Sequence, residues 1–244
     1  MPTTIVTAFM TKINNIDFRS HDKYIDYGNK LLSLNLPIVM FIEQYMYDLH
    51  YKENLSKYPS CRFVIFERYE NYLYEYLSQV TKYEVKTNNP SKDTIGYMFV
   101  QCHKTEWLRK AIELNPFHTE NFVWIDFGIY HMIKNDEILK ESVAELAMKQ
   151  YPSVRIASCV DPHEPCYVDI YHQVAWFFAG SIVGGNSETL LKFADIMKEF
   201  CMNIIKEKNH IMWEVNIWYL IYKEYPEIFD FYPCDHNASI LQNY

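Results

Sequence analysis

The stretch that most constrains the fold is residues 122–128, which read FVWIDFG. Its first four residues are apolar, and a short run of this kind predicts a strand buried on both faces, as inside a parallel or mixed sheet. Asp126 follows the run at once, and a carboxylate in such a place is costly without a partner. Ligands of open α/β sheets bind in the crevice outside the carboxyl ends of the strands. The stretch therefore predicts that Asp126 meets a metal or a substrate hydroxyl across a cleft, with capping of the next segment as its alternative role.

Apolar runs and helical periodicities alternate along the rest of the chain and predict one α/β domain over residues 1–244. A strand at 3–9, a helix that ends near Leu34 and a strand at 38–42 make a βαβ unit. Further strands are predicted at 62–66, 122–125 and 154–158 and in the tail from 228, and further helices at 67–80, 95–114, 137–150, after a capping Asn186, and at 212–222. Extended chain is expected to cross the core at 174–186, and a mobile loop at 82–94.

Charge and hydropathy exclude several classes of partner. The formal net charge is −8, and no run of Lys and Arg stands out. Because a nucleic-acid-binding surface needs a basic stripe, we expect no DNA or RNA partner. The longest apolar stretch, 174–183, is too short to span a bilayer as a helix, and no basic region precedes the first apolar run. We expect a cytoplasmic protein without a transmembrane segment, and peripheral attachment to a membrane stays open.

The six cysteines lie in mostly apolar or aromatic surroundings, and none forms a C-x-x-C pair. This usage predicts free thiols in a reducing compartment. A zinc loop made of Cys159, His163 and Cys166 is the alternative. A structural zinc site needs four ligands, however, and the sequence offers no second pair.

Three features suggest a site: Asp126, the paired glycines Gly184 and Gly185, and two late polar residues, Glu214 and His236. The sequence has no G-x-x-x-x-G-K-[ST], G-x-G-x-x-G or G-x-S-x-G motif. Those absences disfavour a P-loop nucleotide hydrolase, a dinucleotide-dependent oxidoreductase and an α/β-hydrolase.

Three segments, at 5–9, 122–128 and 179–185, resemble those of the HtrL/YibB-type family of glycosyltransferases. The resemblance extends over most of the chain, from Thr4 to Ile240. It implies the GT-A fold, a single Rossmann-like domain with a mixed, mostly parallel sheet flanked by helices. That fold binds a nucleoside-diphosphate sugar and usually a divalent metal, manganese or magnesium.

The resemblance also implies a metal site. It places Asp126 at the first aspartate of the D-x-D metal motif, but Gly128 stands at the second, so one carboxylate is missing. Magnesium and manganese prefer oxygen ligands in octahedral geometry, and the diphosphate supplies some of them. Because GT-A enzymes often add a late histidine, Asp126 and His236 are the implied protein ligands. For His236 the alternative is a surface histidine in a polar tail.

Sugar contacts are implied for Gly180, Gly184 and Gly185, as a loop where the missing Cβ lets backbone lie against the ligand. A tight strand-to-helix turn is the alternative for each of them. Glu214 is implied as the acid beside the acceptor, which in an inverting transferase removes the proton from the attacking hydroxyl. Its alternative is a solvated first-turn glutamate favoured by the helix dipole.

Donor contacts are implied at the end of the first strand and in two later places. Thr7, Ala8 and Phe9 match the usual position of nucleotide-base contacts. Lys104 is similar to a lysine near the donor, where a cation balances the leaving diphosphate, and an exposed lysine is the alternative. Arg19 is the implied phosphate contact.

The resulting hypothesis is a glycosyltransferase that moves a sugar from a nucleoside-diphosphate sugar to a hydroxyl of a glycan or small acceptor. The missing second aspartate motivates a rival: a non-catalytic sugar-nucleotide or glycan-binding protein on the same scaffold. A metal-dependent hydrolase that uses Asp126 and His236 is weaker, because no second cluster of His and carboxylates is visible. All three require the predicted site residues to converge on one hollow large enough for a diphosphate.

Overall fold

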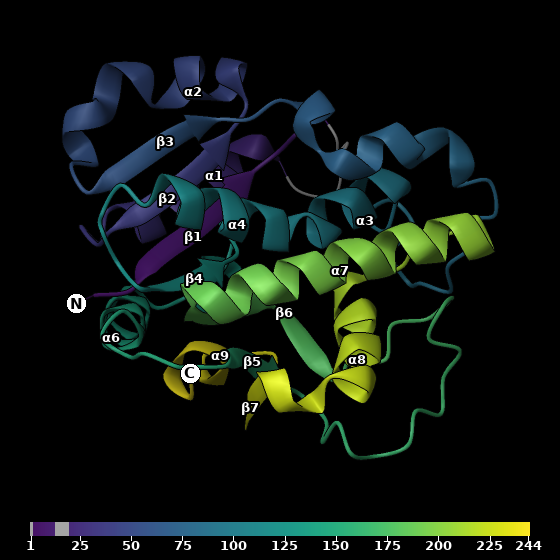
Figure 1. Ribbon diagram of the computed structural model, residues 1–244. Helices are drawn as coiled ribbons and strands as arrows, with labels where there is room; N and C mark the ends of the chain where they lie inside the picture. The colour runs from purple at the N-terminus through teal and green to yellow at the C-terminus, as the bar shows by residue number, and fades with distance from the viewer. Residues whose placement is uncertain (1, 13–19) are drawn as a thin grey trace.

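A computed structural model describes residues 2–12 and 20–244 of the chain (Figure 1). Its centre is a seven-stranded sheet in the order β3-β2-β1-β4-β6-β5-β7. The strands are β1 (Thr4–Phe9), β2 (Ile38–Ile42), β3 (Cys61–Ile65), β4 (Asn121–Ile125), β5 (Val154–Ser158), β6 (Phe178–Asn186) and β7 (Phe229–Pro233). Among these, β6 runs antiparallel to both of its neighbours, and every other adjacent pair is parallel. The predicted mixed, mostly parallel sheet is confirmed.

The sheet is buried on both faces, which explains the short all-apolar runs. Every residue of β2 and β4 is buried. Successive side chains of a strand point to opposite faces, so Ile5 packs into one hydrophobic core and Val6 into the other. The helices α3, α4, α7 and α8 cover the face of Val6, and α1, α6 and α9 cover the face of Ile5. In Figure 1, α7 crosses the sheet beside α4.

The helices are α1 (His21–Leu32), α2 (Gln44–His50), α3 (Ile95–Cys102), α4 (Lys104–Leu114), α5 (Tyr130–Ile133), α6 (Asp136–Leu146), α7 (Ser187–Lys208), α8 (Glu214–Glu224) and α9 (Ser239–Gln242). The predicted cap of α7 is confirmed, because the Asn186 side chain accepts a hydrogen bond from the Thr189 amide at 2.8 Å.

Two predicted helices are wrong in detail. The helix expected at 95–114 is two helices, α3 and α4, which meet at His103. The helix expected at 67–80 is a pair of 3-10 helices, Arg68–Glu70 and Tyr72–Gln79. Between them Asn71 accepts a hydrogen bond from the amide of Leu73, and this side-chain bond competes with helical continuity.

The antiparallel direction of β6 places the candidate site. The amide of Asp126, just after β4, donates to the carbonyl of Ser181 at 2.9 Å. The start of β6 therefore lies at the same edge of the sheet as the carboxyl ends of β1 and β4. Residues 159–177, which precede β6, form no helix or strand although all of them are described.

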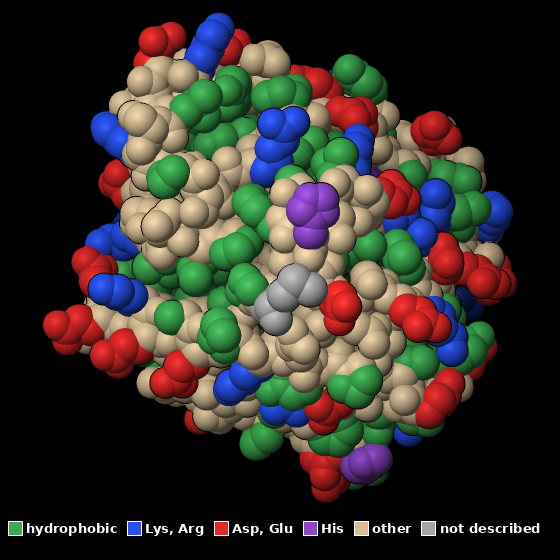
Figure 2. All heavy atoms as spheres, turned by 60° about the vertical axis from the view of Figure 1, so that its left-hand side comes forward, with side chains coloured by type: hydrophobic (Ala, Val, Ile, Leu, Met, Phe, Trp, Pro, Cys, Tyr) green, Lys and Arg blue, Asp and Glu red, His purple; other side chains and the backbone are tan. Residues whose placement is uncertain are grey.

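The described surface carries mixed charge. On the face in Figure 2, acidic and basic side chains are interspersed, as the sequence predicts for a chain without a basic stripe. Within residues 2–12 and 20–244, no helix has the length and apolar character that crossing a membrane requires. All six cysteines are free thiols, as predicted.

Candidate active site

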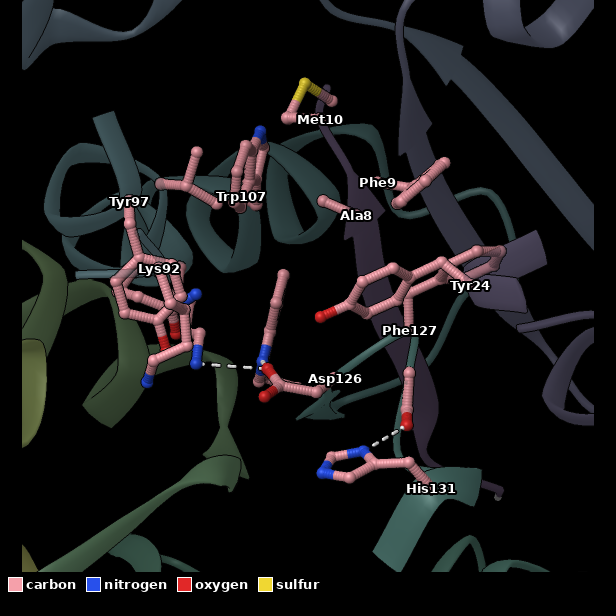
Figure 3. A pocket seen from close by; sticks show the side chains of 15 residues that line it. Ala8, Phe9, Met10, Tyr24, Lys92, Tyr97, Trp107, Asp126, Phe127 and His131 are labelled. Carbon is pink, nitrogen blue, oxygen red and sulfur yellow. Dashed lines mark hydrogen bonds and ion pairs between the residues drawn. The ribbon is translucent and has the colours of Figure 1, made fainter. Parts of the chain in front are cut away.

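Two adjoining hollows make one cleft at the edge of the sheet where β1 and β4 end. The first has a volume of about 210 Å³ and the second of about 410 Å³. They share six lining residues, which are Lys92, Tyr97, Gln101, Lys104, Asp126 and His131. Taken together they fall within the range of about 300–1,000 Å³ that is usual for small-molecule sites. Figure 3 shows Phe9, Tyr24 and Phe127 on one side of the first hollow, Tyr97 and Lys92 on the other, and Asp126 between them.

A buried ion cluster lies where the hollows meet. The Lys104 Nζ is 3.0 Å from Asp126 Oδ1 and 2.9 Å from Glu214 Oε1. It also donates to the carbonyl of Gly180 at 2.7 Å. Lys104 begins α4, Asp126 follows β4 and Glu214 begins α8, so three separate elements meet at one ammonium. The alternative of an exposed Lys104 is wrong, since only 2 % of its side chain is accessible.

Electrostatics keep Lys104 charged. Burial disfavours the charged form of Lys104, but the two neighbouring carboxylates outweigh burial and raise the pKa of Lys104 above the ordinary lysine value. One ammonium between two carboxylates leaves a net negative charge. The cluster is therefore a fixed, partly buried anion that faces the cleft.

Asp126 is held in one orientation. Its Oδ1 accepts from the indole Nε1 of Trp124 at 2.7 Å as well as from Lys104. The Trp124 ring is in turn stacked on Trp107, with centroids 5.5 Å apart. The Asp126 Oδ2 makes no hydrogen bond with a described residue, and 34 % of the Asp126 side chain is accessible. The side-chain contacts of Asp126 are thus with Lys104 and Trp124, rather than with the backbone of a following segment, and one oxygen remains for a ligand.

Gly180 is needed for the cluster to close. A Cβ on this residue would lie 2.1 Å from Glu214 Oε1. Because only glycine allows this approach, the backbone of β6 can accept from Lys104 while Glu214 sits against it. Gly180 lines the second hollow, as the sequence predicts.

The predicted position of Gly184 and Gly185 is wrong. They lie inside β6 opposite Val123 and Phe122, towards the far end of the strand, and neither is among the described residues that line the two hollows. A Cβ on Gly184 would lie 2.1 Å from the Tyr244 hydroxyl, and one on Gly185 would lie 2.3 Å from the Ser153 carbonyl. These glycines permit close packing of the strand.

The wall of the first hollow is aromatic. Phe9 and Phe127 are stacked with centroids 5.1 Å apart, and Tyr24 lies 5.8 Å from Phe9. Ala8 and Phe9, two of the residues predicted to contact the nucleotide base, line this hollow. Thr7 does not, because its side chain points into the sheet interior and is fully buried. The predicted phosphate contact Arg19 lies outside the described residues.

A model of the family described as "bacterial protein of unknown function (HtrL_YibB)" matches residues 1–237. The chain belongs to the HtrL_YibB family. A search of the curated proteins found no match.

Solved structures with a similar fold come from much more distant proteins. Mouse xyloside xylosyltransferase 1, in its apo form, is similar with a TM-score of 0.50 and 10 % identity, over 95 % of this chain and 85 % of that chain. A 4-diphosphocytidyl-2C-methyl-D-erythritol synthase from Anaerococcus prevotii DSM 20548 is similar with a TM-score of 0.43 and 9 % identity, over 99 % of this chain and 90 % of that chain. The first likeness shows that this HtrL_YibB chain has the GT-A fold predicted from its sequence.

The predicted metal ligands do not form a metal site on their own. Within the described residues, no group of three His, Cys, Asp or Glu side chains is placed to hold an ion. His236 lines the second hollow. Its ring is nearly perpendicular to that of Trp176, with centroids 4.7 Å apart, and its Nε2 lies 3.8 Å from Cys159 Sγ. The pair Asp126 and His236 therefore stays a prediction. The zinc loop considered for residues 159–166 gains no support either.

Position 128 has a steric reason to lack a carboxylate. A Cβ on Gly128 would lie 2.8 Å from the ring of Tyr24, which belongs to the aromatic wall. The carbonyl of Gly128 accepts from His131 Nδ1 at 2.7 Å, so the proton on this ring is on Nδ1. Gly128 thus serves packing and the orientation of His131.

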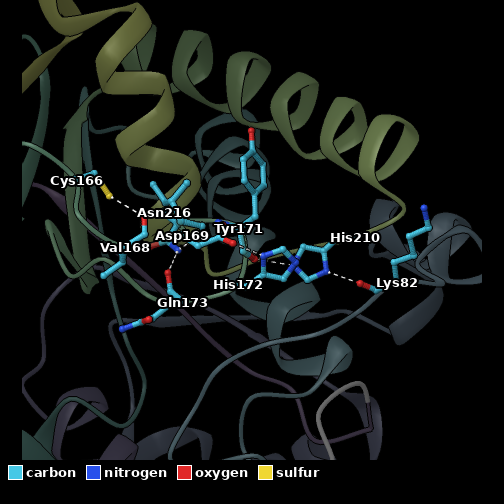
Figure 4. Close-up of polar contacts among 10 residues, drawn as sticks. Lys82, Cys166, Val168, Asp169, Tyr171, His172, Gln173, His210 and Asn216 are labelled. Atoms are coloured by element: carbon cyan, nitrogen blue, oxygen red, sulfur yellow. Dashed lines mark hydrogen bonds and ion pairs between the residues drawn. The ribbon is translucent and has the colours of Figure 1, made fainter.

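Sequence reasoning missed the residues that hold the outer wall of the cleft. Trp176 and Trp213 line the second hollow. Asn216, buried in α8, ties residues 170–175 to that helix (Figure 4). The available signal was an asparagine within the otherwise apolar run 215–221, since a buried amide needs hydrogen-bond partners.

Proposed function

We propose that this chain is a glycosyltransferase that moves a sugar from a nucleoside-diphosphate sugar to a hydroxyl of a glycan or small acceptor. The observation that carries the proposal is the Lys104–Asp126–Glu214 cluster at the junction of the two hollows. Two carboxylates from different elements, one partly exposed and one buried, are fixed by a shared ammonium. Such a preorganised arrangement suits a reaction that depends on positioning and on charge stabilisation.

The donor is assigned to the first hollow and its diphosphate to the shared rim. Aromatic and apolar side chains such as Phe9 and Tyr24 suit a base or ribose face. The rim carries Lys92, and Lys134 adds a second cation on the second hollow. These groups offset the charge that develops on the departing diphosphate.

Glu214 is proposed as the general base. Its Oε1 is held by Lys104, and its Oε2 makes no hydrogen bond with a described residue. As the acceptor oxygen bonds to the anomeric carbon, its proton passes to Glu214, and the bond from that carbon to the diphosphate oxygen breaks. Asp126 orients the donor through its second oxygen. The described residues do not make a preformed metal site, so no step is assigned to an ion.

The test uses Glu214→Gln and Asp126→Asn, with Glu145→Gln on the exposed face of α6 as a control. Release of nucleoside diphosphate from a panel of nucleotide sugars is measured with manganese, with magnesium and with chelator. We expect turnover to fall by about 10²–10⁴-fold in Glu214→Gln, which is the usual contribution of a positioned acid or base, and by about 100-fold in Asp126→Asn, through misplacement of the donor. Thermal shift by the nucleoside diphosphate should persist in Glu214→Gln.

Two outcomes would contradict the proposal. One is full turnover in either cleft variant, and the other is a wild-type protein that neither binds nor turns over any donor of the panel. The chelator arm separately tests the predicted metal. Turnover that is unchanged in chelator would remove Asp126 and His236 as metal ligands while leaving the transferase intact.

A second candidate is a non-catalytic sugar-nucleotide binder. It is favoured by Gly128 at the second D-x-D position and by the lack of a three-ligand metal group in the described chain. Calorimetry separates it from the first, because a binder gives a saturable heat with donor and no slow heat from hydrolysis or transfer. Such a result across metals and acceptors would select the binder.

A further inference from the structure

The second hollow continues into a groove that runs away from Glu214. We call it the Trp176 groove. Lys86, Asn88, Asp93, Gln173 and Trp176 are among the residues that line it. Lys92, Trp176 and Trp213 line the second hollow as well. A ligand with one end at Glu214 therefore has a continuous path over Trp176 into the groove.

Trp176 is held in an unusual state for a large apolar residue. Its backbone φ is 56°, in the left-handed region that bulky residues rarely adopt. Its side chain also remains 44 % exposed, on the wall of a cleft. Both features cost free energy, and such local strain persists where the surrounding structure enforces it, often at ligand sites. The exposed Trp176 ring, which lies beside His236, is thus a candidate ligand surface.

Hydrogen bonds enforce this position from the α8 side. The amide of Ala175 donates to Asn216 Oδ1 at 3.0 Å. The Asn216 Nδ2 donates to the carbonyls of Ile170 and Gln173 at 2.7 and 2.9 Å. Asn216 lies two residues after Glu214 on α8, so one helix fixes both the proposed base and the segment that leads to Trp176.

The opposite wall is joined to the same segment. The amide of Lys86 donates to the carbonyl of His172 at 2.7 Å. The two ring nitrogens of His210 contact the carbonyls of Lys82 and Tyr171, at 3.1 and 2.7 Å (Figure 4). The two sides of the groove are therefore joined at one end, between residues 82–86 and 171–172. Such support is what a precise binding site requires.

The chemistry of the groove fits a sugar chain. Beyond the flat face of Trp176, the exposed side-chain amides of Asn88 and Gln173 make no hydrogen bond with a described residue. Amides both donate and accept, as a ligand rich in hydroxyl groups demands. An aromatic face suits the apolar C–H face of a pyranose ring. Lys86 and Lys92 share the groove with Asp93. The groove is therefore not the basic stripe that binding of a polyanion needs.

We infer that the acceptor is an oligosaccharide of at least two rings, whose reacting ring lies at Glu214 and whose next ring lies on Trp176. This inference rests on the proposed function and adds the substrate class. Trp176 is a specificity residue that touches the acceptor outside the reacting ring.

The test applies the full-length protein to an array of mono- to hexasaccharides built from hexoses and N-acetylhexosamines. Calorimetry then follows on the glycans that bind. We expect binding only from two rings upward. Trp176→Ala should raise the dissociation constant about tenfold, as loss of one aromatic contact predicts. Trp176→Phe should recover part of the lost affinity. Tyr167→Ala is the matched control, because Tyr167 is an 89 % exposed aromatic on the same 159–177 segment and is not among the described residues that line the cleft or the groove.

Three results would overturn the inference: no glycan bound, monosaccharides bound as tightly as longer glycans, or Trp176→Ala equal to the wild type. Turnover of nucleotide sugars by the wild type is measured in parallel. Normal turnover with any of these three results ends the oligosaccharide inference alone. Loss of donor binding and turnover, by contrast, ends the proposed function.

Discussion

At the start of β6, Gly180 lies against Glu214, whereas towards its end Gly184 lies against Tyr244 and Gly185 against Ser153. The steric requirement is the same at all three positions, since a Cβ would approach within 2.1–2.3 Å of a neighbouring atom. The neighbours differ. At the start the neighbour is a carboxylate that is ion-paired with Lys104, and towards the end it is a phenol and a backbone carbonyl.

This difference separates activity from stability along one strand. A change at the start of β6 should disturb the ion cluster and hence the proposed reaction. A change towards the end should disturb packing and leave each folded molecule as active as before. The following variants test whether the two ends are as distinct as their neighbours suggest.

The largest effect is expected for Lys104→Met, which removes the ammonium that binds Glu214 and the Gly180 carbonyl at the start of β6. Two carboxylates then face each other without a counter-charge, and breaking a buried ion pair in this way costs about 3–5 kcal/mol. The free energy of unfolding is measured by denaturant titration, and donor turnover should be lost as well. Lys110→Met on the same helix is the control, because its pair with Glu70 is largely exposed and should contribute less than about 1 kcal/mol. Equal losses in the two variants would mean that the buried cluster has no special role.

The glycines give the next effect and the most direct comparison. Gly180→Ala should displace Glu214, and a misplacement of about 1 Å at a reacting group costs about 100-fold in rate. Gly185→Ala should lower the free energy of unfolding by about 1–3 kcal/mol through overpacking against the Ser153 backbone. Its turnover per folded molecule should match the wild type. Turnover and unfolding are measured on both proteins, and a Gly185→Ala enzyme slower than Gly180→Ala would reverse the assignment of the two ends.

The fold could be predicted from the sequence because burial on both faces leaves a local pattern. All-apolar runs such as 38–42 and 122–125 mark central strands without knowledge of their neighbours. Asp126 was predicted for a similar reason, since a polar residue directly after such a strand must lie at the sheet edge.

The rest of the site depends on contacts that sequence spacing does not encode. Glu214 is 110 residues from Lys104, and no local sequence pattern indicates that the two form an ion pair. The twin glycines Gly184 and Gly185 were misplaced because a glycine pattern gives no strand direction, and the antiparallel course of β6 turns its start to the cleft. Trp176 was missed because it sits in a long irregular segment whose path is set by Asn216.

The smallest effect is a pH dependence of the free energy of unfolding that comes from the Lys104 cluster at the start of β6. The pKa of Lys104 in the folded protein is raised above its unfolded value of about 10.4. A raised pKa means that the stability contributed by the ammonium is fully present below about pH 10.4 and is lost as pH rises through the folded value. The gap in free energy of unfolding between wild type and Lys104→Met should thus be constant up to about pH 10 and then narrow, by at most about 1.4 kcal/mol per pH unit. Gly185→Ala retains the cluster, so its gap from the wild type should stay constant over the same range. Urea titrations from pH 8 to pH 11 measure both gaps, and a Lys104→Met gap that widens with pH would show that the lysine is not stabilised as a cation.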